Sequence, residues 1–338
     1  MSNAELIAEL ASLLSIDAGN IALEPCHSGG NNRVFIVKAG DRKWVAKWYF
    51  RHASDPRDRL GAEYAFLSYA KKLGIDCVPA PLARDDARGI GVYEYVEGSK
   101  LQGKEIAAAE IDAAAGFFLR LNPAEMRAQA SGLPDASEAC FSVAGHCTLV
   151  DQRVARLGAI PGTSEVDGAA REFAAALAAR WQRTKAAILS EVRRAGADPD
   201  AALAERCVSP SDFGFHNALF SPARGICFID FEYAGWDDPA KMVGDFFSHP
   251  GVPVDMAYFE RFLATVVRYA ERPDDLVWRT RLLFPLFRVK WCCIILNDFV
   301  PDAARRRRFA DPAFDEDGRK RAQLDKAQRL LDLVETAQ

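Results

Sequence analysis

The sequence predicts an α+β protein built in two parts. Short apolar runs with strand-like alternation occupy the first hundred residues, at 21–26, 33–39, 43–50 and 92–96. After Gly98 the apolar residues recur at helical spacing instead, over several long segments. A chain of 338 residues is long enough for two modest domains. We therefore expect a boundary near residues 98 to 103, with one part over 1–98 and the other over 99–338.

The N-terminal part begins with a short amphipathic helix over residues 1–15, followed by the strands. A Gly40-Asp41 pair between the second and third strands is typical of a hairpin turn. Residues 58–73 return to helical spacing, with an apolar face of Leu60, Tyr64, Leu67 and Ala70. Pro79 and Pro81 mark an edge strand, because proline cannot donate to a sheet ladder.

The C-terminal part is predicted to be mostly helical. Residues 122–145 show little periodicity and are expected to form a long connection. A hairpin is expected from strands at 218–220 and 226–229. Asp238-Pro239 marks the start of a helix, as an N-cap followed by proline in the first turn. Further helices are expected at 106–121, 145–157, 165–195 (as one helix or a pair), 256–271, 276–298 and 319–334.

Composition narrows the class of protein. Hydrophobic residues make up 49% and charged residues 27%, as in ordinary globular proteins. The net charge of −4 argues against nucleic acid as a partner, and the Arg305 to Arg308 run is read as a solvated helix end beside an acidic segment. No apolar run suits a membrane span and no signal pattern opens the chain, so we expect a cytoplasmic protein without a membrane partner. Eight cysteines without a Cys-x-x-Cys pair are expected to be reduced thiols.

The stretch from residue 209 to 238 carries the candidate chemistry. Asp212 is followed five positions later by Asn217, and a short apolar strand then ends in Asp230. Phosphoryl transfer needs a carboxylate that orients the acceptor hydroxyl and takes its proton, plus oxygen ligands for Mg²⁺. The spacing therefore predicts Asp212 as the catalytic residue and Asn217 with Asp230 as metal ligands. For each residue alone, a loop hydrogen bond or a turn cap is the simpler interpretation.

The motifs PSDFGFHN and CFIDFEYAGWDDPAKMVGDF resemble those of the aminoglycoside phosphotransferase and choline kinase family. The usual family pattern is His-x-Asp, four residues, Asn, then Ile-Asp-Trp or Ile-Asp-Phe. Pro210 stands at the position of the histidine, which is thought to brace the loop. The resemblance implies a two-lobed protein-kinase-like fold with a small antiparallel-sheet N-lobe and a larger, mostly helical C-lobe.

A glycine-containing stretch at HSGGNNRVF allows close backbone approach to a phosphate, although a plain hairpin turn is the commoner reading. It is similar to the nucleotide loop of the same family, which implies nucleotide binding by Gly29, Gly30, Asn31 and Asn32. Strand alternation places Lys47 beside Val45, among apolar neighbours, with a solvated edge position as the alternative. The resemblance implies that Lys47 contacts the α- and β-phosphates and that Glu63 pairs with it. It also implies main-chain contacts to adenine from the hinge residues Glu94, Tyr95 and Val96.

The resemblance implies an enzyme that uses ATP and Mg²⁺ to phosphorylate a hydroxyl of a small molecule, such as an aminoglycoside, a sugar, choline or another amino alcohol. Protein-kinase activity is disfavoured because the motifs Asp-Phe-Gly and Ala-Pro-Glu are absent. The rival hypothesis is a non-catalytic pseudokinase with a regulatory or assembly role, which Pro210 supports. Glu232 and Asp237 are interpreted either as acceptor-side carboxylates or as residues of a solvated loop.

Overall fold

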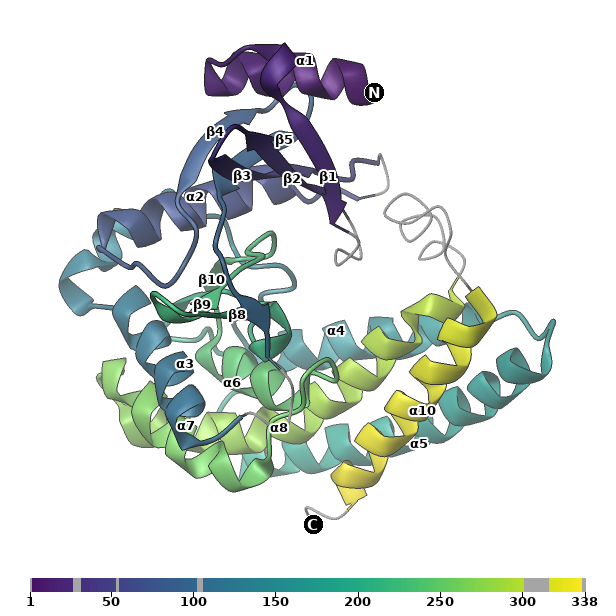
Figure 1. The fold of residues 1–338 in the computed structure, drawn as a ribbon. Coiled ribbons are helices and arrows are strands. Elements are labelled where there is room, and N and C mark those ends of the chain that lie inside the picture. The colour runs from purple at the N-terminus through teal and green to yellow at the C-terminus, as the bar shows by residue number, and fades with distance from the viewer. Residues whose placement is uncertain (1, 27–31, 53–54, 102–105, 301–315, 336–338) are drawn as a thin grey trace. The chain divides into compact units, whose positions relative to one another are not determined.

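A computed structural model describes residues 2–26, 32–52, 55–101, 106–300 and 316–335 (Figure 1). These residues form two compact units. The first contains the chain up to Lys100 together with Ala218–Tyr233, and the second contains Leu101–Asn217 and the described residues from 234 onward. The first unit is therefore discontinuous in sequence, because it also includes a segment from the middle of the chain.

A five-stranded antiparallel sheet forms the body of the first unit. Its strands lie in the order β1-β2-β3-β5-β4. The expected β2–β3 hairpin is present, and Gly40 adopts the positive φ of +59° that its turn requires. The strand with the prolines lies at the sheet edge, as expected. The strand bounds are β1 (Ala22–Cys26), β2 (Arg33–Ala39), β3 (Arg42–Trp48), β4 (Pro81–Asp85) and β5 (Ile90–Glu94).

Two helices cover opposite faces of this sheet (Figure 1). Helix α1 (Asn3–Leu14) buries Leu6 and Leu10 in a cluster with Trp44 and other apolar strand residues. Helix α2 (Arg59–Lys72) begins at Asp58, whose side chain accepts a hydrogen bond from the Gly61 N–H. Side chains alternate along a strand, so Trp44 and Ala46 point toward α1 while Lys47 points toward α2.

The segment that returns to the first unit is the expected hairpin. Strands β8 (Ala218–Ser221) and β9 (Gly225–Phe228) pair with each other, and the short β6 (Ser99–Lys100) adds a third strand. The Phe228 N–H donates to the Cys77 carbonyl at 2.8 Å, and the Phe231 ring stacks on Phe66 of α2 at 4.6 Å. The hairpin therefore places the residues after β9 against helix α2.

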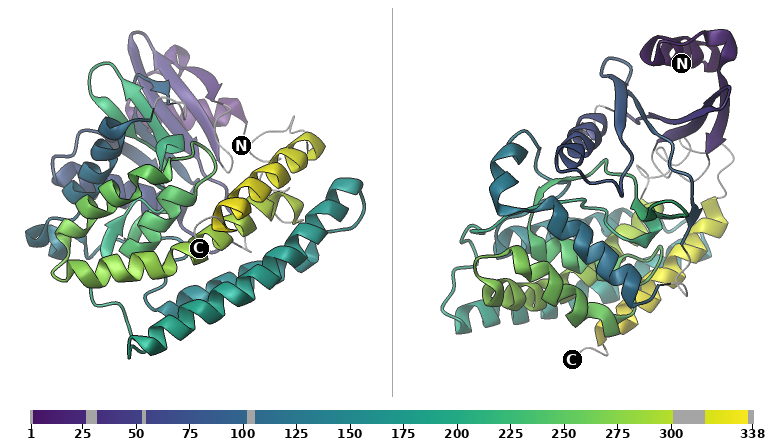
Figure 2. Two further views of the ribbon diagram at one scale, coloured as in Figure 1. Left: turned by 90° about the horizontal axis from the view of Figure 1, so that it is seen from below. Right: turned by 60° about the vertical axis from the view of Figure 1, so that its left-hand side comes forward.

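The second unit is mainly helical, and α6 is a fully buried helix within it. All ten residues of α6 are buried, and the helix packs on α8. Helices α5 and α10 run beside α8 (Figure 2). A two-stranded sheet pairs β7 (Cys207–Ser209) with β10 (Gly235–Asp237). The helices are α3 (Ala108–Leu121), α4 (Val143–Arg156), α5 (Glu165–Arg194), α6 (Pro239–Ser248), α7 (Phe259–Val266), α8 (Pro273–Ile295) and α10 (Glu316–Glu335).

The structure departs from the predicted helices in a few places. The predicted helix or helical pair over 165–195 is one continuous helix of 30 residues, Glu165–Arg194. The predicted helix over 256–271 is instead a 3₁₀ turn, the eight-residue α7 and a second 3₁₀ turn. The connection over 122–145 contains a 3₁₀ segment, Ala124–Ala130, and ends where Ser142 caps α4.

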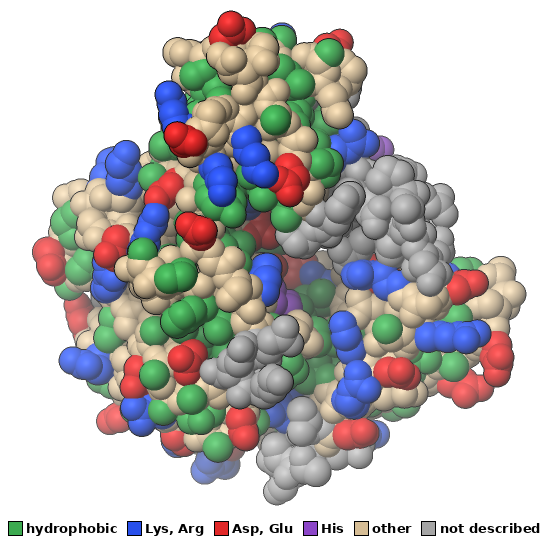
Figure 3. Space-filling view, in the orientation of Figure 1, with side chains coloured by type: hydrophobic (Ala, Val, Ile, Leu, Met, Phe, Trp, Pro, Cys, Tyr) green, Lys and Arg blue, Asp and Glu red, His purple; other side chains and the backbone are tan. Residues whose placement is uncertain are grey.

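Surface charge, helix hydrophobicity and the cysteines were the subjects of the expectations from composition. Basic and acidic side chains are interspersed on the face shown in Figure 3. Among the residues that the structure describes, no helix combines the length and apolar character needed to cross a bilayer. All eight cysteines lie in the described ranges as thiols, and those at 147, 207, 227, 292 and 293 are buried.

The close packing of α6 on α8 gives a prediction about stability. A Cβ atom at Gly244 would overlap the Phe287 ring, so Gly244→Ala should lower the free energy of unfolding by about 1–3 kcal/mol. Beyond its chain neighbours and its own helix backbone, a Cβ atom at Gly116 in α3 would have no other atom within 4 Å, so Gly116→Ala is the matched control and should stabilise the protein by about 0.5–1 kcal/mol. Urea unfolding would measure both. Equal effects of the two substitutions would contradict this account of the contact.

Candidate active site

Lys47 lies near the end of β3, in the first unit, between two carboxylates. Its Nζ is 2.7 Å from Glu63 Oε1 and 2.7 Å from Asp230 Oδ1. Burial alone disfavours the ammonium, but the charges of Asp230 and Glu63 outweigh it and raise the pKa of Lys47. The side chain therefore remains a fixed cation.

Glu63 is itself held by neutral donors inside the unit. Its side chain is 1% exposed, its Oε2 accepts from the Tyr49 hydroxyl at 2.5 Å, and its Oε1 accepts from the Phe231 N–H at 3.3 Å. The Tyr49 hydroxyl also lies 2.7 Å from that of Tyr93. Burial, and then the charge of Glu63, raises the pKa of Tyr49, so this phenol stays protonated. These contacts fix the carboxylate that faces Lys47.

Asp230 follows β9 in a left-handed conformation, with φ of +70°. Aspartate tolerates this region better than most residues, although it still carries some strain. The side chain is 38% exposed, so the contact with Lys47 leaves part of the carboxylate accessible. Asp230 can therefore pair with Lys47 and still offer an oxygen to a cation.

Asn32, in the predicted nucleotide loop, is tied to two parts of the first unit. Its Oδ1 accepts from the Phe50 N–H at 3.1 Å, and its Nδ2 donates to Glu232. The other loop predictions, at Gly29, Gly30 and Asn31, lie outside the described residues.

Neither interpretation of Glu232 fits the structure. The residue is 4% exposed and is held by Asn32 and by Arg59, whose Nε lies 3.7 Å away. Burial and the nearby charge of Asp230 raise the pKa of Glu232 to about 7. Glu232 is therefore neither a solvated loop residue nor an exposed carboxylate for an acceptor.

The predicted hinge begins at Glu94, the last residue of β5, and continues through Tyr95 and Val96. The side chain of Glu94 is engaged, because its Oε2 accepts from the Ala80 N–H at 3.0 Å and its Oε1 pairs with Arg224. The Lys43 ammonium lies over the Tyr95 ring, 5.3 Å from its centroid, and Val96 is buried. Because these side chains already contact other residues, any contact to an adenine base would come from the main chain.

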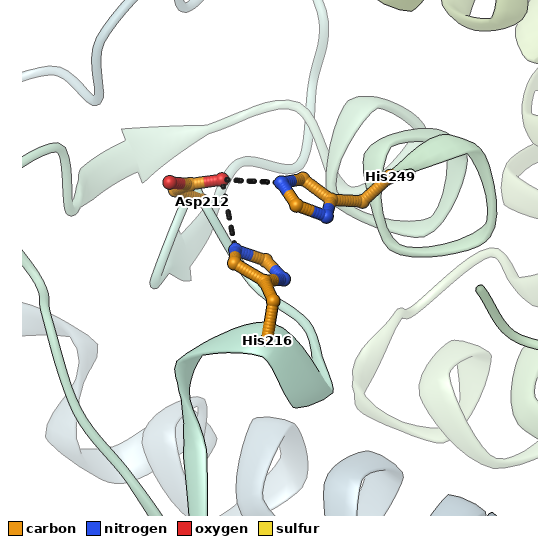
Figure 4. Close-up of side chains that lie close together, drawn as sticks. All are labelled: Asp212, His216 and His249. Atoms are coloured by element: carbon orange, nitrogen blue, oxygen red, sulfur yellow. Dashed lines mark ion pairs between the residues drawn. The ribbon is translucent and has the colours of Figure 1, made fainter. Parts of the chain in front are cut away.

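Asp212 lies in the second unit, on the loop after β7. Its Oδ1 is 3.3 Å from His216 Nε2 and 3.7 Å from His249 Nε2 (Figure 4). The two imidazole rings are stacked, with their centroids 3.4 Å apart. Burial alone would raise the pKa of Asp212, but the two histidines lower it well below its usual range. Its side chain is 29% exposed. Asp212 is therefore an accessible carboxylate that stays ionised.

Asn217 closes the same loop. Its Nδ2 donates to the Asp212 main-chain carbonyl at 3.1 Å, which leaves its Oδ1 as the atom for a cation. Asn217 directly precedes β8 and Asp230 follows β9 by two residues, and the register pairs Ala218 with Phe228. The two predicted metal ligands thus flank the same hairpin along the chain.

The sequence did not single out the two histidines beside Asp212. His216 stands inside the PSDFGFHN motif, four residues after Asp212, so its proximity could have been inferred. His249 is the residue that follows α6, and no spacing in the sequence connects it to Asp212.

One nitrogen of each ring and one oxygen of Asp212 lie within 4.8 Å of one another, which is close enough to suit a transition metal. However, His249 Nδ1 accepts a hydrogen bond from the Gly251 N–H at 3.0 Å, so the ring proton belongs on Nε2, which faces Asp212. A nitrogen that carries a proton cannot bind a metal. In this arrangement His249 directs an N–H toward the carboxylate.

The two aspartates before α6 are also buried. Asp238 is the predicted N-cap of α6, and it additionally pairs with His146 at 3.0 Å and Arg279 at 2.6 Å. Asp237 is fully buried, and its Oδ2 lies 2.6 Å from Lys241 Nζ. Both interpretations of Asp237, as an acceptor-side and as a solvated carboxylate, are therefore wrong, because its charge is used inside the unit.

His249 gives a prediction about pH. Burial, and then the neighbouring His216, lowers the pKa of His249 to about 3. In the unfolded chain a histidine has a pKa of about 6.5, so between these values only the unfolded state binds the proton and stability falls as pH decreases, by about 1.4 kcal/mol per pH unit. His249→Gln should show a pH dependence shallower by this amount below pH of about 6.5. Urea unfolding at several pH values measures it, and the exposed His52→Gln is the control. Parallel profiles for wild type and His249→Gln would contradict the prediction.

Comparison with known proteins identifies the family. The model of the phosphotransferase enzyme family matches residues 22–279. A search of curated proteins finds no match.

Solved structures share the fold across nearly the whole chain. Choline kinase from Cryptosporidium parvum has a TM-score of 0.60 at 12% identity, covering 98% of this chain and 97% of its own. A choline/ethanolamine kinase family protein from Mesorhizobium loti has a TM-score of 0.59 at 18% identity, covering 98% and 95%. A macrolide 2'-phosphotransferase from Brachybacterium faecium has a TM-score of 0.56 at 18% identity, covering 92% and 99%. The predicted kinase-like α+β fold is confirmed, and the chain belongs to the phosphotransferase enzyme family.

Proposed function

We propose that this phosphotransferase moves the γ-phosphoryl group of ATP to a hydroxyl of a small molecule, with Mg²⁺ as cofactor. The main support is the Lys47 ammonium, held between the carboxylates of Glu63 and Asp230. A lysine paired with a helix glutamate and placed beside a metal-binding aspartate is how kinases hold nucleotide phosphates.

The nucleotide side is assigned to residues 29–32, 47, 63 and 94–96. Lys47 binds the α- and β-phosphates, and Glu63 holds its ammonium in place. Gly29, Gly30, Asn31 and Asn32 are assigned to phosphate binding, and the main chain of Glu94, Tyr95 and Val96 is assigned to the adenine.

Asn217 and Asp230 are proposed to bind Mg²⁺. Both offer an oxygen atom, which is the ligand type that Mg²⁺ prefers, and each has another contact that orients it. Bound by these two residues, Mg²⁺ would supply positive charge to offset the negative charge that develops during transfer. The fit rests on the donor set, an amide oxygen and a partly exposed carboxylate.

Asp212 is proposed to act on the acceptor. Its carboxylate orients the acceptor hydroxyl and takes its proton while the oxygen forms a bond to the γ-phosphorus and the bond to ADP breaks. Because the neighbouring histidines hold Asp212 in its ionised form, it can accept that proton at neutral pH. The acceptor is proposed to be an aminoglycoside, a sugar, choline or another amino alcohol.

A coupled ADP-release assay with MgATP and a panel of these acceptors tests the function. Asp212→Asn should lower kcat by about 10²- to 10⁴-fold, because the proton acceptor is lost, and should leave ATP affinity nearly unchanged. Asp112→Asn is the matched control, because Asp112 is a surface residue paired with Arg261. ATP binding without turnover on any acceptor would favour the pseudokinase hypothesis, which Pro210 motivates. Turnover that survives Asp212→Asn would remove Asp212 from its role.

The phosphate-binding role of Lys47 gives a separate prediction. Lys47→Met leaves Glu63 buried without its cation, so it should cost about 3–5 kcal/mol of stability and weaken MgATP binding. Adding Glu63→Gln should restore much of the stability, since the buried charge is gone, but not the affinity. Thermal unfolding and calorimetric titration with MgATP measure the two effects. Full ATP affinity in the stable double variant would contradict the role of Lys47.

A further inference from the structure

We propose that Lys241, a buried residue of α6, is a positioning residue that holds the Asp212 loop in its active shape. The inference rests on the proposed role of Asp212. Lys241 Nζ donates to Ser211 Oγ at 3.2 Å, and Ser211 directly precedes Asp212. The charge of Lys241 also lowers the pKa of Asp212, but no hydrogen bond or ion pair joins the two side chains, so the positioning acts through the main chain of Ser211.

The loop at Ser211 needs such support because its backbone is strained. Ser211 has a φ of +65°, in the left-handed region that non-glycine residues rarely adopt. Pro210, just before it, has no N–H with which to hold the loop. Ser211 donates through its own N–H to Ser209 Oγ at 3.0 Å, and the Phe213 N–H donates to the Ser211 carbonyl at 2.8 Å. These local bonds make a tight bend, and the Ser211 hydroxyl links it to a separate element.

Lys241 can hold the Ser211 hydroxyl in place because ion pairs fix the position of its own ammonium. The residue is 1% exposed, and its Nζ lies 2.6 Å from Asp237 Oδ2 and 3.6 Å from Asp245 Oδ2. A buried ammonium is costly unless it is paired, so these carboxylates hold it strongly. Asp237 is on β10, and it pairs across the sheet with Cys207 of β7, the strand that leads into the loop. The ion pair thus joins α6 to the sheet at the base of the loop.

The same charge network reaches Asp212 from a second direction. Asp245 accepts from Lys290 Nζ at 2.7 Å and from Trp291 Nε1 at 2.8 Å. The Trp291 ring meets the His249 ring edge-on, with centroids 4.4 Å apart, and His249 faces Asp212. Lys241 and its two aspartates therefore support both the backbone before Asp212 and the imidazole beside it.

A purely structural role for Lys241 makes a different prediction from a positioning role. If Lys241 only neutralises Asp237 and Asp245 in the core, then losing the Ser211 hydroxyl leaves those pairs intact and catalysis unchanged. If Lys241 positions Asp212, the hydroxyl is the connection that matters.

The decisive variants are Ser211→Ala and Ser211→Gly in the full chain. Both remove the hydroxyl, and glycine also suits a φ of +65° better than serine does. We expect kcat to fall by about 10- to 100-fold in both, with KM for ATP unchanged, because a misplaced catalytic group slows the chemical step. Wild-type kcat in Ser211→Gly would overturn the proposal.

A third variant removes the attachment from the other side. Lys241→Met alone leaves Asp237 buried and unpaired and is expected to unfold easily. Asp237→Asn with Lys241→Met removes both charges, so it should remain more stable than Lys241→Met and still lose kcat to the same extent as Ser211→Ala. Retained kcat in the folded double variant would also overturn the proposal.

Hydrogen exchange provides a readout that does not need activity. Loss of a hydrogen bond to a charged group should speed amide exchange in a peptide spanning 209–217 by about tenfold or more, with α5 unchanged as the internal control. Unchanged exchange in Ser211→Ala would overturn the proposal even in an active enzyme. Faster exchange in a protein whose wild type turns over no acceptor would support the positioning contact while the proposed function fails.

Discussion

Each compact unit encloses a lysine ammonium shared by two carboxylates. In the first unit Lys47 lies between Glu63 and Asp230, and in the second Lys241 lies between Asp237 and Asp245. Removing an ammonium from water is costly, and only closely placed negative charges offset that cost. A buried lysine with its two carboxylates therefore constrains every helix or strand that contributes one of these side chains. In the first unit β3, α2 and the end of the β8–β9 hairpin must meet at one point, and in the second α6 must meet β10.

Two residues of the candidate site have a backbone conformation that is unusual for a residue other than glycine. Among the described residues four non-glycine residues have a positive φ, and two of them are Asp230 and Ser211, the neighbour of Asp212. A strained conformation persists only when its surroundings specify it strongly, and each of these positions borders a buried lysine. Backbone strain therefore occurs beside a charge pair at both positions, and the charge pair provides the rigidity that the strained backbone requires.

Local sequence signals predicted the elements well because the forces that form them are local. The Gly40 turn, the helix over 58–73, the Asp238 cap and the hairpin of strands 218–220 and 226–229 all depend on neighbouring residues, and the structure contains each of them with small differences in bounds. The 256–271 segment was less predictable, since helical spacing does not show where a helix tightens into a 3₁₀ turn.

Only part of the candidate site could be predicted from the sequence, because several of its contacts join residues that are far apart in the chain. Asp212, Asn217 and Asp230 could be named from spacing, whereas the pairing of Lys47 with Glu63 was expected only from the family resemblance. The burial of Glu232 and Asp237 was not predicted, because it depends on Arg59 and Lys241 as counterions. His249 reaches Asp212 only through the fold.

The chain leaves the first unit after Lys100, returns for Ala218–Tyr233 and leaves again. Lys47 and Glu63 are therefore encoded before the first departure, and Asp230 during the return. A gene fusion with a single breakpoint near codon 100 would join Lys47 and Glu63 to an aspartate from another parent. Exchange of the N-terminal segment between relatives should thus succeed only when the hairpin is exchanged with it, so this part of the protein is inherited as two linked pieces of sequence.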